Sequence, residues 1–222
     1  MQIILLTLLS LLSVFMSISE RRERDRQKVR TKILDAAREL FAREGYDAVT
    51  MRRIAETIEY SPTTIYLHFK DKDALIRELC RVDALSLSQA FTHVATEPDP
   101  LERLRKLGMA YVAFGMNHPN HYRLMFMSNR LNEEDQLAEM GHGNPETDGY
   151  QLLFNTFQQA LSDQRLRPEL TDPHMLSQAF WASVHGVVAI HITLYGDPWI
   201  EWRSLEETAG MTIDAMIRGI SL

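Results

Sequence analysis

Cysteine is almost absent from this sequence: one residue, Cys80, occurs in a chain of 222. A single cysteine excludes an intramolecular disulfide and is typical of a reducing compartment. Strand patterns are also lacking, because apolar and polar residues do not alternate over any long stretch. The composition is otherwise that of a globular protein, with 45% hydrophobic and 24% charged residues. A disordered or fibrous chain is therefore excluded.

The common signatures of an enzyme or a metal site are missing as well. The sequence holds no G-x-S-x-G segment, no phosphate-binding loop and no metal-ligand spacing. His118 and His121 are three residues apart, but Pro119 interrupts a helix there and we expect no carboxylate cluster nearby. His185, beside Gly186, is interpreted as a packed histidine at a close helix crossing. We expect no catalytic residue, no metal and no cofactor; an all-α enzyme using His185 or the two other histidines is the alternative.

Net positive charge is missing from the chain as a whole, whose formal charge is −6. The average conceals an asymmetry. Between Glu20 and Arg81 there are 15 Lys/Arg and 12 Asp/Glu, whereas the remainder carries 9 and 18. A basic N-terminal part on an acidic body predicts an anionic partner for the N-terminal part alone.

Residues 1–19 carry no charged side chain, and an arginine-rich stretch follows them. Three interpretations stay open for this apolar segment. A signal peptide would need a basic start and a small-residue cleavage site, which are missing. A membrane anchor needs about 20 apolar residues, and the arginines would keep the rest in the cytoplasm. The third is that translation begins at Met16. In each case we expect the segment to lie outside the fold, and the arginines can serve a membrane surface or DNA.

Apolar residues in the body of the chain recur at spacings of three and four, which predicts helices. Thr50 and Ser61 are expected N-caps, and Gly45 a C-terminal stop. The expected helices cover 27–43, 51–58, 62–69, 72–93, 101–117, 119–128, 133–140, 148–161, 173–194 and 205–220. The predicted fold is all-α, with a three-helix head and connecting helix over 27–88 and a larger helical body over 97–222.

Residues 50–69 hold two short helices separated by a tight turn, the arrangement of a helix-turn-helix whose second helix enters the major groove of DNA. Thr63 and Thr64 can bond phosphates or bases, and Tyr66 and His68 offer polar tips on flat rings. The N-terminus of the second helix favours a phosphate. Four cations flank the motif and can neutralise backbone charge: Arg52, Arg53, Lys70 and Lys72.

A set of residues in this part is shared with one family. They are Ile33-Leu34-Asp35-Ala36-Ala37, Leu40-Phe41, Gly45, Thr50, Ile54-Ala55, Ser61, Thr64-Ile65-Tyr66, His68-Phe69 and Lys72-Asp73-Ala74-Leu75. In these residues the sequence resembles the TetR (tetracycline-repressor-like) family of bacterial transcription regulators, in register over about residues 28–88. The resemblance implies base or backbone contact by Thr63, Thr64, Tyr66 and His68. It also implies phosphate contact by Thr50 and Lys72.

Two further features bear on the resemblance. Glu59 stands in the turn where the family often has glycine, and a non-glycine residue at positive φ is uncommon, so we expect a reshaped turn. The segment 181–186 looks like the Trp…His-Gly signature of one C-terminal subgroup, in which the penultimate helix pairs with its symmetry mate.

In line with the resemblance, we expect a homodimeric, cytoplasmic regulator that binds a near-palindromic operator in double-stranded DNA. We expect a repressor released by a small ligand, and the aromatic residues of the body imply that this inducer is apolar or aromatic. A membrane-tethered regulator is the alternative if residues 1–19 are retained. We expect a dimer interface made by a small-residue stripe on one helix and an apolar stripe on the next: Ala182, His185, Gly186 and Ala189, and Ala209, Ile213, Met216, Ile217 and Ile220. Bundle interiors host ligands, and the expected pocket residues are Tyr111, Phe114, His118, Tyr122, Phe126, Phe154, Phe157 and Trp181.

Overall fold

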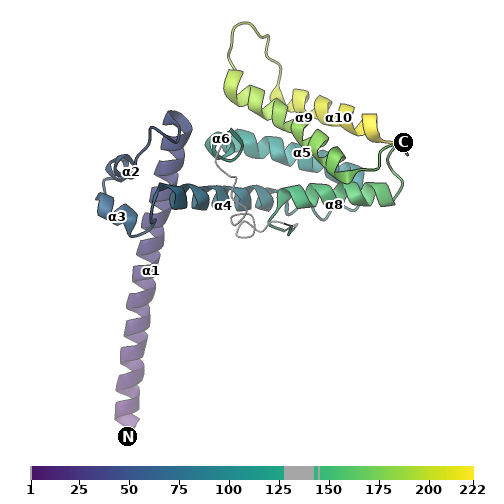
Figure 1. Ribbon diagram of the computed structural model, residues 1–222. Coiled ribbons are helices and arrows are strands. Elements are labelled where there is room, and N and C mark those ends of the chain that lie inside the picture. Colours follow the sequence, from purple (N-terminus) through teal and green to yellow (C-terminus); the bar gives the residue numbers. More distant parts are fainter. Residues whose placement is uncertain (1, 128–142, 145) are drawn as a thin grey trace. The chain divides into compact units, whose positions relative to one another are not determined.

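The computed structural model describes the backbone of residues 2–127, 143–144 and 146–222, and the side chains of these residues from Ser19 onward. Within these ranges the fold is all-α (Figure 1). The described helices are α1 (Gln2–Glu44), α2 (Met51–Thr57), α3 (Pro62–Tyr66), α4 (Lys72–Phe91), α5 (Pro100–Asn117), α6 (Pro119–Met127), α8 (Gly149–Ser162), α9 (Pro173–Leu194) and α10 (Leu205–Ile220). The helix expected over 133–140 lies outside the described residues.

The chain divides into two compact units, residues 1–76 and 77–222. We call the first unit the head and the second the body. The head contains α1, α2, α3 and the start of α4, and the body contains the rest of α4 and the later helices. Each unit is described by itself.

The first helix begins at Gln2, so the expectation that it starts near residue 27 was wrong. No proline or glycine occurs between Gln2 and Glu44, and adding a residue to an existing helix is far easier than nucleating a new one. The helix ends where it was predicted to end. Gly45 takes a φ of 80°, and its N–H bonds the carbonyl of Phe41.

The two short helices of the head are set by their caps. The Thr50 side chain accepts the N–H of Arg53, and the Ser61 side chain accepts that of Thr64. Pro62 occupies the first turn of α3, where its missing N–H costs nothing. Helices of seven and five residues cannot persist alone, so their stability comes from packing. The buried residues of α2 and α3 form one head core with buried residues of α1 and of the adjoining loops. This core consists of Ile33, Ala37, Leu40, Phe41, Val49, Ile54, Ala55, Ile65 and Phe69.

The turn between α2 and α3 keeps the glycine-type conformation without a glycine. Glu59 has a φ of 59°, so the expected reshaping of the turn does not occur. The next N–H, that of Tyr60, bonds the carbonyl of Ala55 at 2.9 Å and closes the helix end. An L-residue held in the left-handed region costs roughly 1–2 kcal/mol, which the surrounding contacts offset.

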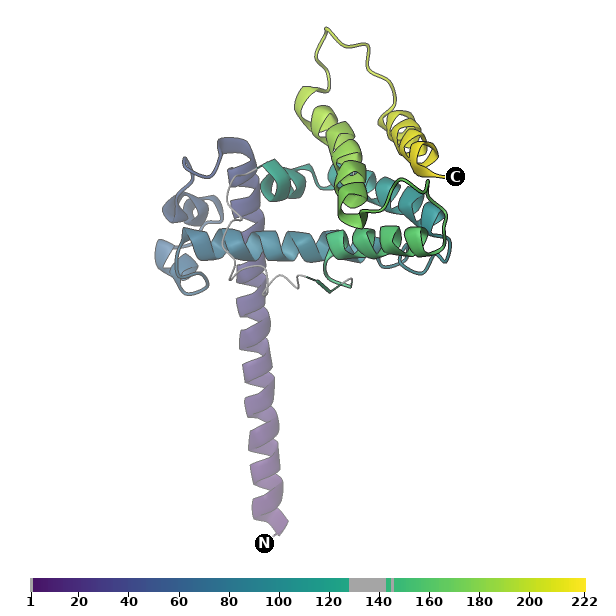
Figure 2. The ribbon, with the colours of Figure 1, turned by 45° about the vertical axis from the view of Figure 1, so that its right-hand side comes forward.

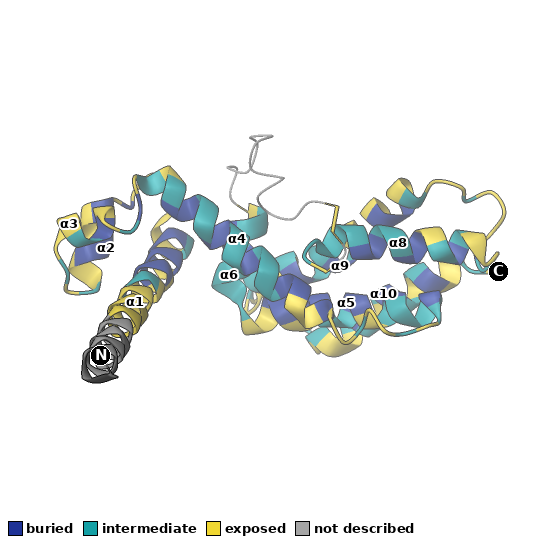
Figure 3. Cartoon of the chain, turned by 90° about the horizontal axis from the view of Figure 1, so that it is seen from below, coloured by how far each residue is buried: buried dark blue, intermediate teal, exposed yellow. Residues whose placement is uncertain are grey.

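The body is arranged around α5, which contacts α6, α8, α9 and α10 (Figure 2). Glycines on α5 allow two of these helices to approach closely: a Cβ at Gly108 would lie 2.7 Å from Ile213, and one at Gly115 would lie 2.5 Å from Val188. The buried faces of α5, α8, α9 and α10 point at one another (Figure 3). α9 is, among the described residues, the helix long and apolar enough to cross a membrane by length and composition. Its apolar side supplies the core with Leu176, Phe180 and Val188.

The position of α10 corrects the expected dimer stripe. Ala209, Ile213, Ile217 and Ile220 are at most 9% exposed and belong to the core of their own chain. The opposite face of α10 carries Met211, which is 67% exposed. An apolar stripe at helical spacing marks a buried face, but the sequence does not say whether the same chain or a second chain buries it.

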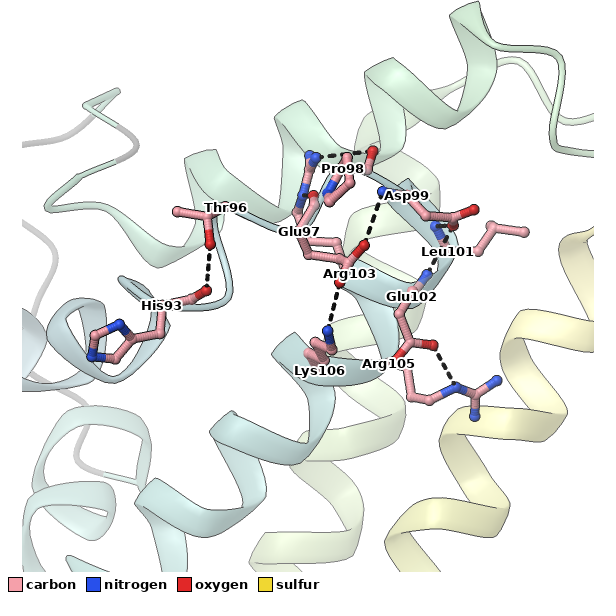
Figure 4. Close-up of polar contacts among 10 residues, drawn as sticks. All are labelled: His93, Thr96, Glu97, Pro98, Asp99, Leu101, Glu102, Arg103, Arg105 and Lys106. Atoms are coloured by element: carbon pink, nitrogen blue, oxygen red, sulfur yellow. Dashed lines mark hydrogen bonds and ion pairs between the residues drawn. The ribbon is translucent and has the colours of Figure 1, made fainter.

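A polar corner joins α4 to α5 (Figure 4). Asp99 caps α5 by accepting the N–H groups of Leu101 and Glu102, and its other oxygen lies 2.9 Å from Arg165. The guanidinium of Arg103 donates to the Glu97 carbonyl at 2.7 Å. These contacts stop the chain from continuing as one helix between α4 and α5, in the gap between the helices expected over 72–93 and 101–117.

Candidate DNA-binding surface and ligand cavity

α3 presents its outer face to solvent. Ile65 is fully buried and fixes the helix against the head core, whereas Tyr66 is 55% exposed. Thr63 is exposed and Thr64 is half-buried, with its hydroxyl 3.0 Å from that of Ser61. Thr63 and Tyr66 therefore share the exposed side of one short helix, while Thr64 is partly covered and Phe69 is buried.

Thr50 and Arg52 lie at the start of α2. Thr50 uses its hydroxyl as the N-cap, and the exposed Arg52 bonds Glu56 on the next turn at 3.0 Å. Exposed pairs of this kind contribute little to stability, so the guanidinium is available to a phosphate at small cost.

Lys72 performs a structural task that its sequence position did not indicate. Its ammonium donates to the carbonyls of Tyr46 and Val49 at 2.5 and 2.6 Å, and it lies 3.9 Å from the centre of the Tyr46 ring. The neighbouring Asp73 bonds the Tyr46 hydroxyl. The lysine thus fastens the loop between α1 and α2 to the start of α4. Phosphate contact by Lys72 stays a prediction.

His68 lies just beyond the end of α3, within reach of two arginines from α1. The guanidinium of Arg30 donates to its carbonyl at 3.3 Å and lies 4.4 Å from the centre of the Phe69 ring. Partial burial, together with the charges of Arg26 and Arg30, lowers the pKa of His68. The imidazole is therefore neutral at pH 7 and can both donate and accept a hydrogen bond.

The body contains a cavity of about 250 Å³. Helices α4, α5, α6, α8 and α9 and the segment before α8 contribute to its wall. Three of the predicted pocket residues line it: Tyr111, Phe126 and Trp181. Sequence reasoning missed most of the other wall residues, among them Ala84, Leu87, Phe91, Leu107, Met125, Leu153 and Phe180. They carry the same apolar spacing as core residues, so nothing in the sequence separates the two groups.

The other five predicted pocket residues lie outside the cavity lining. Phe114, Tyr122 and Phe157 are buried in the core. The ring of His118 packs 5.1 Å from that of Phe114, and the ring of Phe154 lies 4.3 Å from that of His174.

A chain of hydrogen bonds leads from two wall residues, Trp181 and Tyr111, into the core. Trp181 Nε1 donates to the hydroxyl of Tyr111 at 3.1 Å, and that hydroxyl donates to the hydroxyl of Tyr122 at 3.2 Å. The Tyr122 hydroxyl lies 2.5 Å from Nδ1 of His185 and 3.3 Å from the carbonyl of the same residue, and either atom can accept its proton. Burial raises the pKa of Tyr111 to about 12 and also raises that of Tyr122, and it lowers the pKa of His185. Both phenols therefore stay protonated and the imidazole stays neutral. The hydrogen bonds thus hold the Tyr111 and Trp181 side chains of the wall in place.

The polar groups on the wall are already paired within the protein. Ser88 donates to the carbonyl of Thr147, Asp148 caps α8, and the Tyr150 hydroxyl lies 3.2 Å from Nδ1 of His174. Among the described residues, no lysine or arginine lines the cavity. The described part of the wall thus offers shape and apolar surface, with no buried cation to hold an anion.

Two further observations concern the remaining histidines. Nδ1 of His121 lies 2.9 Å from Oδ1 of the fully buried Asp83 on α4, a single carboxylate that the sequence did not place there. The described residues nonetheless include no group of three His, Cys, Asp or Glu that could hold a metal ion. Among the described residues no close helix crossing is found at Gly186, because a Cβ there would meet nothing within 4 Å.

Comparison with known proteins agrees with this division into head and body. Residues 33–79 match the family model described as bacterial regulatory proteins, tetR family. Residues 104–214, half of the chain, match the model described as tetracyclin repressor-like, C-terminal domain.

Relatives and solved structures extend the comparison. The HTH-type transcriptional repressor Rv1474c of Mycobacterium tuberculosis is 50% identical over 54 residues, which are 24% of this chain and 29% of that protein. The ketosteroid transcriptional regulator KstR2 of M. tuberculosis has a TM-score of 0.68 at 20% identity, over 87% of this chain and 95% of its own. AibR, in complex with isovaleryl coenzyme A and operator DNA, has a TM-score of 0.67 at 19% identity, over 86% and 97%. At these identities the structures show the shared fold.

Proposed function

The chain belongs to the TetR family of bacterial regulatory proteins, and from this premise we propose that it is a sequence-specific DNA-binding repressor released by a small neutral ligand. The observation that carries the proposal is the exposed face of α3, which is capped by Ser61 and held by one buried isoleucine. On this helix Thr63 and Tyr66 are exposed and Thr64 is half-buried. A short helix fixed in this way can enter a major groove without losing its own support.

The operator can be found by selecting bound duplexes from random or genomic DNA. Tyr66→Ala and Thr64→Ala should each weaken binding to the selected duplex by about 1–3 kcal/mol, with no loss of thermal stability. Tyr195→Ala is the matched control, because this body tyrosine is similarly exposed, at 64%. Operator affinity that is unchanged in both head variants would refute the assignment of α3.

The cavity supports a ligand of defined chemistry. An engineered cavity of about 150 Å³ holds benzene, so about 250 Å³ has room for roughly ten non-hydrogen atoms. The wall is apolar, its polar groups are paired, and no described cation lines it. We therefore infer a neutral, largely apolar or aromatic ligand, since a buried carboxylate would lose its hydration without gaining a partner.

A matched pair of probes tests the ligand class. 1-Naphthol should bind, quench the fluorescence of Trp181 and release the operator, whereas 1-naphthoate should bind at least tenfold more weakly. Ala84→Leu fills the wall and should abolish the response, while Ala90→Leu, at an exposed position on the same helix, should not. Equal binding of the carboxylate, or an unaffected response in the Ala84 variant, would refute the proposal.

Release of DNA requires a link between cavity and head. α4 supplies a continuous one, because Lys72 at its start fastens the head loop and Ala84, Leu87 and Phe91 line the cavity. A ligand that favours one setting of α4 must lower DNA affinity by the same factor by which DNA lowers ligand affinity. Coupling of about 1–3 kcal/mol gives roughly 5–150-fold release.

The protein is proposed to act as a homodimer in the cytoplasm, where it meets its DNA. On α9 Ala182 is exposed and Gly186 and Ala189 are half-buried, and Met211 is exposed on α10. A two-fold pairing of these faces requires a near-palindromic operator. A monomer at micromolar concentration by light scattering would refute the dimer.

We propose no enzymatic activity, because the hydrogen-bonded tyrosines stay protonated and His185 stays neutral.

A further inference from the structure

The arginine-rich middle of α1, residues 21–30, has two kinds of cation on its surface. Arg24 donates to the carbonyl of Glu20, and Lys28 pairs with Asp25 at 3.6 Å, so both are engaged along their own helix. No hydrogen bond or ion pair to another described residue engages the exposed guanidinium of Arg22 or Arg26. The unengaged arginines are therefore a distinct subset of the run.

The spacing of these arginines places them in one row. Arg22, Arg26 and Arg30 are four residues apart, so they share a face of α1 and stand about 6 Å from one another along its axis. We call these three residues the α1 arginine row. Its three members span roughly 12 Å.

The structure fixes the direction in which the row faces. Arg30 donates to the carbonyl of His68 and stacks on Phe69, directly after α3. The charge of Arg26 reaches the same imidazole and contributes to the lowering of its pKa. The row thus begins beside the end of the helix that carries the proposed base-reading residues and continues outward from it.

We propose that Arg22 and Arg26 bind backbone phosphates of the duplex that flanks the site read by α3, so that the DNA-binding surface extends onto α1. This inference rests on the proposed DNA-binding function. The charge is complementary and the row is continuous with the reading helix, with Arg30 as the fixed member between them. Guanidinium groups bind phosphates at close range, and such contacts position a protein without reading bases.

The test measures the salt dependence of operator binding by the full-length chain. The slope of log K against log[salt] changes by about 0.9 for each phosphate that the protein no longer neutralises. In a dimer, Arg22→Ala/Arg26→Ala leaves four phosphates without their arginine and should reduce the slope by about 3.6. The protected DNA should also become shorter at its outer ends, while the ratio of operator to mutated-operator affinity stays the same. The double variant Arg24→Ala/Lys28→Ala removes the same charge from the engaged cations and should change the slope far less.

Three outcomes would overturn the proposal. One is an unchanged slope and footprint in the Arg22/Arg26 variant, and another is an equal effect of both double variants, which would indicate net charge alone. The third is loss of binding to vesicles containing anionic lipid with DNA binding intact, which would assign the row to a membrane surface. Failure of the proposed function looks different, because the wild-type chain would then select no duplex and Tyr66→Ala would have no effect.

Discussion

In the head, a five-residue helix is fixed by a serine cap, a proline in the first turn and one fully buried isoleucine. In the body, α9 has 22 residues, and one of its faces packs into a core that also encloses a cavity. In the head helix Ser61, Pro62 and Ile65 each have a specific local task, whereas the apolar residues of α9 act together as one face of the core. Function in the head is therefore tied to residue identity, and function in the body is tied to the shape of a space.

The largest effect should come from emptying the body core. Phe157 is fully buried and packs edge-on against Phe180, so Phe157→Ala should lower the free energy of unfolding by about 3–5 kcal/mol. Phe126→Ala should cost clearly less, because that ring already borders an empty space and is packed against fewer atoms. Urea unfolding followed by circular dichroism measures both. Equal losses of unfolding free energy in the two variants would mean that the cavity wall is packed as tightly as the core. The contrast between a replaceable wall and a filled core would then be wrong.

A smaller effect, about 3 kcal/mol, is expected at the junction of the head with α4. Lys72→Met keeps the aliphatic stem but removes two charge-assisted hydrogen bonds to loop carbonyls. Thermal unfolding of this variant is compared with that of Lys70→Met, an exposed control two residues earlier. If Lys72→Met kept its stability and lost only salt-dependent DNA affinity, phosphate contact would be the main task of Lys72.

The turn of the head offers a stabilising change of about 1 kcal/mol. Glu59→Gly removes the steric cost of a side chain at a φ of 59°. Glu56→Gly, inside α2, should instead lose about 1 kcal/mol through helix propensity. The melting temperatures of the two variants show whether each substitution stabilises or destabilises the protein. Operator specificity should be unchanged in the Glu59 variant. A loss of stability in both variants would show that the glutamate contributes contacts which outweigh the strain.

The smallest effect is on pH dependence and involves both units. His68 and His185 have folded-state pKa values below the usual value of about 6.5. The unfolded chain therefore binds protons first as the pH falls through about 6.5, so stability should decrease on acidification from there. His185→Gln should flatten the decrease measured by chemical unfolding at pH 7.5, 6.5 and 5.5. A stability that rises on acidification over this range would contradict the neutral imidazole and the direction of its hydrogen-bond chain.

Local chemistry made most helices predictable. Cap residues, proline in a first turn and glycine after a last turn act within a few residues of where they stand, so Thr50, Ser61 and Gly45 marked their boundaries. α1 was the exception, because no breaker stands between Gln2 and Glu44 and propagation continued through the apolar segment. Whether Met1 or Met16 is the start stays a prediction.

Periodicity and neighbouring residues were enough to specify an all-α chain, a helix-turn-helix head and the residues on the reading helix. The folded chain was needed to show which aromatic residues line the cavity, that the α10 stripe is buried within its own chain, and that Lys72 fastens a loop. It also brought Asp83 to His121 and the α1 arginine row to the end of α3. These are relations between residues distant in the sequence, and the packing of whole helices sets them.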